Sequence, residues 1–498
     1  MKLVGEASIV YVQGQDQRRQ PIQQAVITGT NHKCEVNMKQ LPAEFCTRMK
    51  ALLSEEEYDA FLESFEKPTV RGLRLNLHKL MELEESTDPE AIRYAKLIAD
   101  WHLEPMPESS RISFRGQTMY TSFYLDDRYL ESIGIRPGKH PYHEAGLYYI
   151  QGPEAMQVVQ HMQIRPFDRV IDLCASPGGK STQAADLLSA DAGGFLISNE
   201  YVALRARTLS SNIERMGLRN AAVLNEDTGK IADHFPEFFT RVLVDAPCSG
   251  EGMFRKDDTA ITEWSVENVR MCAERQREIT ANAYRMLAPG GILAYSTCTF
   301  EKEEDEDIRD YLLGSFPELT LLYEKRVWPQ REPGEGHYMA IFRKAGSDPL
   351  AALEERYGLT VSEPDRPLEE KDYKKQQVKD QGYLVSSMLP ALHGLRCLRA
   401  GIQSETCLKN RTEPAHALSH VLNPADAAAF QRFKLQCCSY PATDPRIDQY
   451  LRGLQITAPE GVSGKGWCVV CADGVALGLG KLVNGQVKNH FPKGLRFV

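Results

Sequence analysis

The sequence predicts an α/β protein: a central domain with a mostly parallel, doubly wound sheet, a small N-terminal α+β module and a β-rich C-terminal domain. Short apolar runs recur from residue 169 onward and alternate with stretches of helical periodicity. The runs are 170–173, 195–198, 222–224, 242–244, 291–295 and 339–342. Strands that are apolar along their whole length and alternate with helices indicate a parallel sheet buried on both faces.

The regions before and after these runs have different patterns of apolar and charged residues. Residues 38–66 carry apolar side chains at spacings of three and four, which predicts helix, and Arg71–Asn76 alternates as a strand does. Arg71 and Arg74 are interpreted with equal weight as a solvated strand face or as contacts to phosphate. Residues 346–382 are charged and irregular, which indicates a linker or a solvated helix.

A chain of 498 residues is too long for one ordinary core, so we expect several domains. We divide it into an extension of unknown role (1–37), an N-terminal module (38–130), the central domain (131–345), a charged linker (346–382) and a C-terminal region (383–498). Residues 1–37 are either a genuine extension or precede a translation start at Met38.

The composition is that of a globular protein in a reducing compartment. Hydrophobic residues make up 42% of the chain, and no apolar run approaches the ~18 residues of a membrane span. The 12 cysteines are expected to be free thiols. The pair Cys468 and Cys471 lies in a β-like run, where residues three apart face opposite sides, so a metal there is disfavoured. We expect a cytoplasmic monomer with no metal and no membrane contact.

The net charge of −9 argues mildly against a nucleic-acid partner. Basic residues nevertheless outnumber acidic ones from Gly382 to Val498, and the rest of the chain is acidic. A basic module attached to an acidic body could bind phosphates, so composition alone does not decide the matter.

A glycine-containing loop follows the first predicted strand of the sheet. It reads Cys174-Ala175-Ser176-Pro177-Gly178-Gly179-Lys180, and a helix is expected to begin near Ser181. Glycines let a ligand approach the backbone closely, and a helix N-terminus favours negative or polar groups. A phosphate loop would need glycine in place of Cys174, so ATP binding is disfavoured.

Acidic residues follow the second and third strands. Glu200 is placed to accept hydrogen bonds from ribose hydroxyls, and Asp227 to accept one from an adenine amino group. Each could instead cap a helix. Three strand ends that face one crevice together predict an adenosine ligand.

Two cysteines follow the fourth and fifth strands, within Asp245–Gly250 and Ser296–Thr299. If these strands are neighbours, Cys248 and Cys298 lie together beside the adenosine site. Carbon 5 of cytosine is a weak nucleophile, but a thiolate that adds to carbon 6 creates an enamine whose carbon 5 attacks a methyl donor. The second thiol could help to release the product, and a protonated Asp245 could hydrogen-bond N3 of the base.

These motifs resemble the signature motifs of the Nol1/Nop2/Sun RNA cytosine-5 methyltransferases, and the similarity runs from about Met38 to Val498, with Gly336–Ala340 included. The resemblance implies a Rossmann-like class I methyltransferase domain with S-adenosylmethionine as cofactor. It implies that Cys298 is the nucleophile, that Cys248 assists release, and that the cofactor site is lined by Cys174, Ala175, Ser176, Pro177, Gly178, Gly179, Lys180, Glu200, Asp227 and Asp245. Ser176 stands where the family commonly has alanine, a change that should fit.

The C-terminal region is similar to the PUA-like extension of the RsmF group, in residues 413–418 and 489–496. Members of that group act on small-subunit ribosomal RNA, so the resemblance implies an RNA partner, either 16S rRNA or the assembled 30S subunit. Transfer RNA is the alternative substrate.

Two other functions compete with this interpretation. A methyltransferase acting on an exocyclic amine would tend to have an aromatic residue where Cys248 stands, and it would not need the thiol of Cys298. A ribosome-assembly factor that binds RNA without catalysis is the second alternative, and the intact cysteine pair argues against it.

Overall fold

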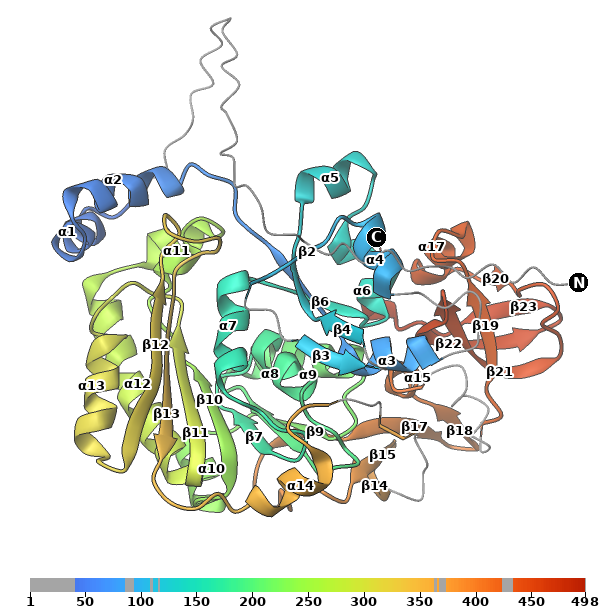
Figure 1. Ribbon diagram of the computed structural model, residues 1–498. Helices are drawn as coiled ribbons and strands as arrows, with labels where there is room; N and C mark the ends of the chain where they lie inside the picture. Colours follow the sequence, from blue (N-terminus) through green and yellow to red (C-terminus); the bar gives the residue numbers. More distant parts are fainter. Residues whose placement is uncertain are drawn as a thin grey trace, which may run out of the picture. The chain divides into compact units, whose positions relative to one another are not determined.

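The computed structural model describes residues 41–85, 94–107, 111–114, 117–361, 365–366, 373–422 and 433–497. The expectations for residues 1–37 and for a start at Met38 lie outside these residues. The described chain forms an N-terminal module, a large central sheet covered by helices on both faces, and two further sheets near the C-terminus (Figure 1).

The N-terminal module begins with two helices, α1 (Ala43–Leu52) and α2 (Glu55–Ser64), where the sequence predicted one helical region. They are separate because Ser54 caps α2: its hydroxyl accepts a hydrogen bond from the Glu57 amide at 3.3 Å, in a capping box. A four-stranded sheet in the order β2-β5-β1-β6 follows, and a hairpin and short helices flank it. These elements are β1 (Gly72–Leu75), α3 (Leu77–Glu85), α4 (Tyr94–Asp100), β2 (Glu104–Pro105), β3 (Arg111–Phe114), β4 (Gln117–Tyr120), β5 (Ser122–Tyr124), α5 (Asp127–Ser132), α6 (Pro141–Glu144) and β6 (Tyr148–Gln151).

Arg74 on β1 contradicts both interpretations given to it from the sequence. Its side chain is 2% exposed and forms an ion pair with Asp186 of the central domain. It also donates a hydrogen bond to the Thr182 hydroxyl at 2.7 Å. A buried guanidinium that is paired in this way joins the N-terminal module to the central domain and is available neither to solvent nor to phosphate. Arg71 is partly exposed and pairs with Asp127.

The central sheet has eight strands in the order β12-β13-β11-β10-β7-β8-β9-β16. Its parallel core is β7 (Arg169–Asp172), β8 (Phe195–Asn199), β9 (Ala221–Leu224), β10 (Phe239–Asp245) and β11 (Leu287–Thr297), as the apolar runs predicted. β12 (Leu319–Val327) and β13 (His337–Lys344) add an antiparallel edge.

Helices cover both faces of the central sheet (Figure 1). On one face pack α7 (Pro153–His161), α8 (Gly179–Ala185) and α9 (Ala203–Arg215). On the other pack α10 (Thr228–His234), α12 (Val266–Met286) and α13 (Glu306–Ser315). The doubly wound α/β domain predicted from the sequence is therefore confirmed.

The region expected to be a charged linker contains ordered structure. Besides α14 (Glu354–Tyr357), it holds β14 (Tyr373–Val378), which pairs with β15 (Gln381–Ser386) in a sheet with β17 (Ile402–Leu408) and β18 (Arg411–Pro414). The side chains of β14 are almost all exposed, so their charge reflects an edge strand rather than a linker. β16 (Cys397–Ala400) extends the central sheet by pairing with β9.

The last part of the chain is a five-stranded sheet in the order β19-β21-β22-β23-β20, with α15 (His416–His420) and α17 (Pro445–Leu451) beside it. Its strands are β19 (Gln436–Tyr440), β20 (Ile456–Thr457), β21 (Lys465–Ala472), β22 (Val475–Val483) and β23 (Gln486–Asn489). This sheet is the β-rich C-terminal domain that the sequence predicts.

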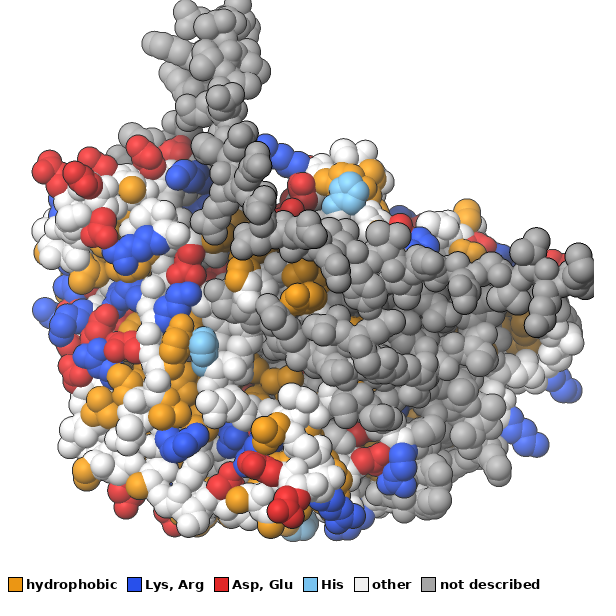
Figure 2. Space-filling view, in the orientation of Figure 1, with side chains coloured by type: hydrophobic (Ala, Val, Ile, Leu, Met, Phe, Trp, Pro, Cys, Tyr) orange, Lys and Arg blue, Asp and Glu red, His pale blue; other side chains and the backbone are white. Residues whose placement is uncertain are grey.

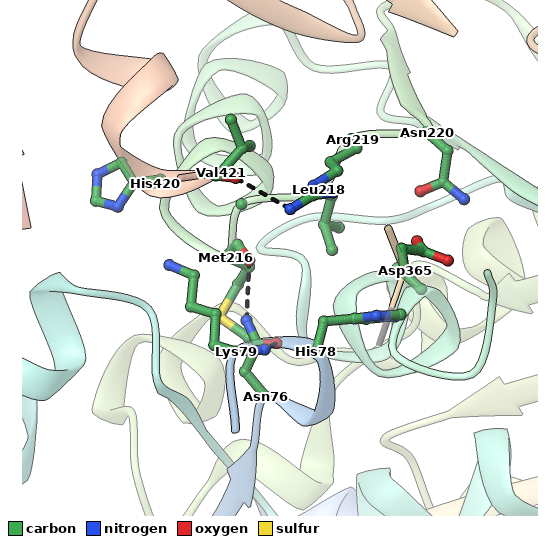
Figure 3. A pocket seen from close by; sticks show the side chains of 12 residues that line it. Asn76, His78, Lys79, Met216, Leu218, Arg219, Asn220, Asp365, His420 and Val421 are labelled. Carbon is green, nitrogen blue, oxygen red and sulfur yellow. Dashed lines mark hydrogen bonds between the residues drawn. The ribbon is translucent and has the colours of Figure 1, made fainter. Parts of the chain in front are cut away.

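Three parts of the chain meet around a small polar pocket (Figure 3). Asn76 donates a hydrogen bond to the carbonyl of Met216 at 2.9 Å, and Arg219 donates one to the carbonyl of Val421 at 3.2 Å. These contacts tie the N-terminal module and the C-terminal region to the loop between α9 and β9.

Acidic and basic side chains are interspersed over the described residues on the face shown in Figure 2. All cysteines of the described residues are free thiols. Among the described helices, none is long and apolar enough to cross a membrane.

Candidate active site

Cys248 and Cys298 lie together at the carboxyl edge of the sheet. β10 and β11 are parallel neighbours with Asp245 opposite Ser296, so the segments that follow the two strands run side by side. The two Sγ atoms are 3.2 Å apart, and the Cys298 amide donates a hydrogen bond to the Cys248 sulfur at 3.3 Å. The hydrogen bond with Cys298, together with burial, raises the pKa of the Cys248 thiol well above its ordinary value. The Cys248 thiol therefore keeps its proton in the resting protein.

Asp245, at the end of β10, is held as a carboxylate. Lys180 at the start of α8 approaches it with a 2.8 Å ion pair, and the Ser296 hydroxyl donates a hydrogen bond to it at 2.7 Å. Burial opposes ionisation, but Lys180 and the hydrogen bonds outweigh it and lower the pKa of Asp245. The sequence-based suggestion of a protonated Asp245 is therefore not the resting state: this side chain accepts hydrogen bonds.

A cavity of about 740 Å³, within the size range of small-molecule sites, is lined by Cys248 but not by Cys298. Six residues predicted for the site line it, together with residues of α12 that the sequence did not indicate. The predicted residues are Cys174, Ser176, Glu200, Asp227, Asp245 and Cys248, and the α12 residues are Arg275, Glu278 and Ile279. Tyr201, Val202 and Arg205 also line the cavity.

The loop between β7 and α8 makes its turn at the glycines that the sequence indicates. Gly178 has a left-handed φ of 117°, which explains the need for glycine at this position. Lys180 is directed to Asp245 and does not line the cavity beside it. Ala175, Pro177, Gly178 and Gly179 build the turn without lining that cavity.

The two acids after β8 and β9 differ in their partners. Glu200 is buried and accepts a hydrogen bond from the Val202 amide at 2.8 Å, with Arg205 3.6 Å away. Asp227 lies three residues beyond the end of β9 and caps α10, where its Oδ1 accepts hydrogen bonds from Gly229 and Lys230. Asp227 therefore both caps α10 and lines the cavity. A buried carboxylate and a second acid are suitable acceptors for the ribose hydroxyls and the amine of an adenosine.

Buried acids lie behind the thiols, and the sequence interpretation missed them. Glu304 accepts hydrogen bonds from the amide and hydroxyl of Ser249, next to Cys248, and from Gln276 at 2.7 Å. The Ser249 hydroxyl also approaches Glu251 at 2.8 Å. The run of acids at 303–307 is typical of a solvated helix start, so only the tertiary structure reveals that some of these carboxyls are buried.

In the described part of the chain, no three His, Cys, Asp or Glu side chains come together as metal ligands. Cys468 and Cys471 lie in different hydrophobic clusters, on opposite faces of β21, as their spacing predicts.

The fold and the site define a Rossmann-like methyltransferase with two adjacent thiols at the carboxyl edge of its sheet. Family models match three parts of the chain: the N-terminal domain of 16S rRNA methyltransferase RsmF over residues 41–153, 16S rRNA methyltransferase RsmB/F over 159–343, and the RsmF PUA domain over 438–497. Ribosomal RNA small subunit methyltransferase F of Vibrio cholerae is 30% identical over 492 residues, which cover 91% of this chain and 97% of that protein. The chain belongs to the ribosomal RNA small subunit methyltransferase F family.

Other relatives agree with this assignment. The protein of the same name from Pectobacterium carotovorum is 29% identical, over 91% of this chain and 96% of its own. The structure of NSun6 from Pyrococcus horikoshii with SFG superposes with a TM-score of 0.50 at 21% identity, over 62% of this chain and all of that one. PH0851 gives 0.51 at 22% identity, over 61% of this chain and 66% of that one. The two structures show the shared fold. This chain is an RNA methyltransferase, and S-adenosylmethionine is the methyl donor of its family.

Proposed function

We propose that this protein methylates carbon 5 of a cytosine in 16S ribosomal RNA through a covalent bond between Cys298 and carbon 6 of the base. The observation that carries the proposal is the pair of sulfurs, 3.2 Å apart, of which that of Cys248 lies in the wall of the cavity. Transfer to an exocyclic amine needs no thiol, whereas activation of carbon 5 does. The family and its relatives, named for small-subunit RNA, support the substrate class.

The two thiols have different tasks in this mechanism. Cys298 adds to carbon 6 as the thiolate, and its proton passes to solvent, because Cys248 already holds its own proton. Carbon 5 then takes the methyl group, and water removes the proton from carbon 5. The bond between the Cys298 sulfur and carbon 6 breaks last, and the adjacent Cys248 thiol donates a hydrogen bond to the departing thiolate. Cys248 thereby assists release.

Asp245 and Lys180 are placed to recognise the base. The ionised Asp245 accepts a hydrogen bond from the exocyclic amine of cytosine, a donor that uracil lacks. The Lys180 ammonium has further N–H groups besides the one directed to Asp245, and it stabilises negative charge that develops on the ring when sulfur adds.

The residues around the cavity fit S-adenosylmethionine, which supplies an electrophilic methyl group when bound. Glu200 is suited to the ribose hydroxyls and Asp227 to the adenine amine. The loop 174–180 contributes Cys174 and Ser176 to the wall of the cavity.

The remaining parts of the chain are assigned to RNA. We infer that residues 38–130 and the PUA-like residues 383–498 bind RNA on either side of the methyltransferase domain (131–345), and that residues 346–382 connect them. The RsmF N-terminal match over residues 41–153 and the PUA match over 438–497 support a module on each side of the methyltransferase domain in the sequence, but the N-terminal match runs past residue 130 and includes β6, which pairs with β1. We further infer that the protein acts as a monomer in the cytoplasm and prefers 16S rRNA in the 30S subunit.

Labelled S-adenosylmethionine tests the substrate. Purified protein is incubated with naked 16S rRNA, 30S subunits and transfer RNA, and the labelled nucleoside is identified by mass spectrometry. We expect 5-methylcytidine in 16S rRNA, with more in 30S subunits than in naked RNA. Label confined to transfer RNA would overturn the substrate, label on an amine would overturn the chemistry, and no label in any RNA would favour a non-catalytic assembly factor.

A further inference from the structure

His337, the first residue of β13, lies next to the catalytic edge although it is distant in sequence from both cysteines. In the antiparallel pairing of β11 and β13, Ser296 is opposite Met339 and Thr297 is opposite Tyr338. This register ends at Thr297 and Tyr338, and Cys298 and His337 are the next residues of the two segments. Gly252 gives a second link, because its amide donates to the Cys298 carbonyl at 2.8 Å and an added Cβ would lie 2.3 Å from the carbonyl oxygen of Gly336.

The alternation of side chains along β13 fixes the face on which His337 lies. Met339 packs in the hydrophobic cluster on the side of α7, α8 and α9, and His337 is two residues before it, so the two share that face. Lys180 reaches Asp245 from α8 on the same side. Lys180, Asp245 and Lys256 are the charged groups that act on the imidazole.

The imidazole is buried and has an unused hydrogen-bonding atom. His337 is 3% exposed, and among the described residues its Nε2 has no hydrogen-bond partner. Leaving a buried ring nitrogen unpaired is costly, and such atoms are frequent where a ligand completes the bonding. Asp245, by contrast, is paired with Lys180 and Ser296, and Cys248 with Cys298.

The charge state of His337 indicates what kind of group it meets. Burial, with a contribution from Lys180, lowers the pKa of His337 to about 3, so the ring is neutral at physiological pH. A neutral imidazole offers one donor and one acceptor and makes a poor partner for phosphate, but it suits the uncharged polar edge of a nucleobase.

We propose that His337 is a further base-contacting residue, whose Nε2 forms a hydrogen bond with the polar edge of the target pyrimidine when that base enters the site beside Asp245 and Lys180. This inference rests on the proposed function, because it requires a base held next to Cys298. The base forms this hydrogen bond with His337 after it has flipped out of the RNA, and the hydrogen bond helps to hold carbon 6 of the base next to the Cys298 sulfur.

The test compares two replacements that differ in hydrogen bonding. H337Q retains an amide nitrogen near the position of Nε2, and H337F fills the space without a polar atom. H234F, at an exposed histidine of α10, is the matched control. Each protein is assayed for the single-turnover rate of methyl transfer to the RNA that the wild type modifies, for the KM of that RNA, and for S-adenosylmethionine affinity by calorimetry.

We expect H337F to transfer methyl groups at least roughly tenfold more slowly while its cofactor affinity stays within about twofold, and H337Q to recover most of the rate. If H337F transfers at the wild-type rate, or if H337Q is as slow as H337F, the proposed hydrogen bond is refuted. If thermal unfolding shows that H337F does not fold, H337M takes its place in the same comparison. A wild type that makes no 5-methylcytidine would instead refute the proposed function, and this inference with it.

Discussion

The buried carboxyl of Glu304 should make the stability of the protein depend on pH in a way that one substitution removes. Glu304 is fully buried behind Cys248 and Cys298, with hydrogen bonds from Ser249 and Gln276. Burial and the neighbouring Glu251 raise its pKa from 4.5 to about 8, and the hydrogen bonds only partly oppose this shift. Between these two pH values the folded protein keeps a proton that the unfolded chain has lost.

The sign of the effect follows from this difference in bound protons. The stabilisation is complete below pH 4.5, declines as the pH rises, and is lost as the pH passes through about 8, above which both states are ionised. A shift of this size corresponds to a stability change on the order of 5 kcal/mol, at about 1.4 kcal/mol for each pH unit. Glu304→Gln cannot ionise, and its amide can still bond to Gln276 and Ser249. The variant should therefore match the wild type near pH 5 and exceed its thermal midpoint by several degrees at pH 8.5.

Thermal unfolding between pH 5 and 9, in buffers with small ionisation enthalpies, measures this difference. Glu303→Gln is the matched control, because Glu303 is the adjacent residue, is 37% exposed and pairs with Arg48. Burial disfavours the ionised form of Glu303, but the interaction with Arg48 outweighs burial and lowers the pKa of Glu303. Glu303→Gln should therefore lower the thermal midpoint without flattening the dependence of that midpoint on pH. If Glu304→Gln follows the wild-type curve in parallel from pH 5 to 9, Glu304 is not a protonated buried carboxyl.

Two further predictions concern packing around the site. Arg74→Met should lower the free energy of unfolding by roughly 3–5 kcal/mol, the cost of a buried carboxylate that loses its partner, and calorimetric unfolding that stays unchanged would contradict the buried pair. Gly252→Ala should reduce methyl transfer at least roughly tenfold with cofactor affinity unchanged, because the new methyl group would meet the carbonyl oxygens of Gly336 and Cys298 at 2.3 and 2.9 Å. Gly314→Ala, which meets no atom within 4 Å, is the control, and equal transfer rates in the two variants would refute the steric argument.

The parts of this molecule that are predictable from sequence are those governed by short-range rules. Strand runs, the turn at Gly178 and the acids and cysteines that follow strands are all visible in the chain. The geometry of parallel sheets then brings Cys248 and Cys298 to one edge, and the structure places their sulfurs 3.2 Å apart.

What could not be predicted depends on residues far apart in the chain. The solvated or phosphate-binding interpretations of Arg74 fail because its partner Asp186 lies 112 residues away. The protonated Asp245 fails because Lys180 reaches it across a helix–strand contact. β16 joins the central sheet through pairing with β9, and no local pattern in Cys397–Ala400 identifies that neighbour.

The covalent assignment of the two thiols is tested most directly by denaturing electrophoresis combined with nucleoside mass spectrometry. Wild type, Cys298→Ala and Cys248→Ala are each incubated with labelled S-adenosylmethionine and the RNA that the wild type modifies. The mechanism predicts 5-methylcytidine from the wild type, none from Cys298→Ala, and from Cys248→Ala a protein–RNA adduct that survives denaturation. Formation of 5-methylcytidine by Cys298→Ala would contradict the mechanism.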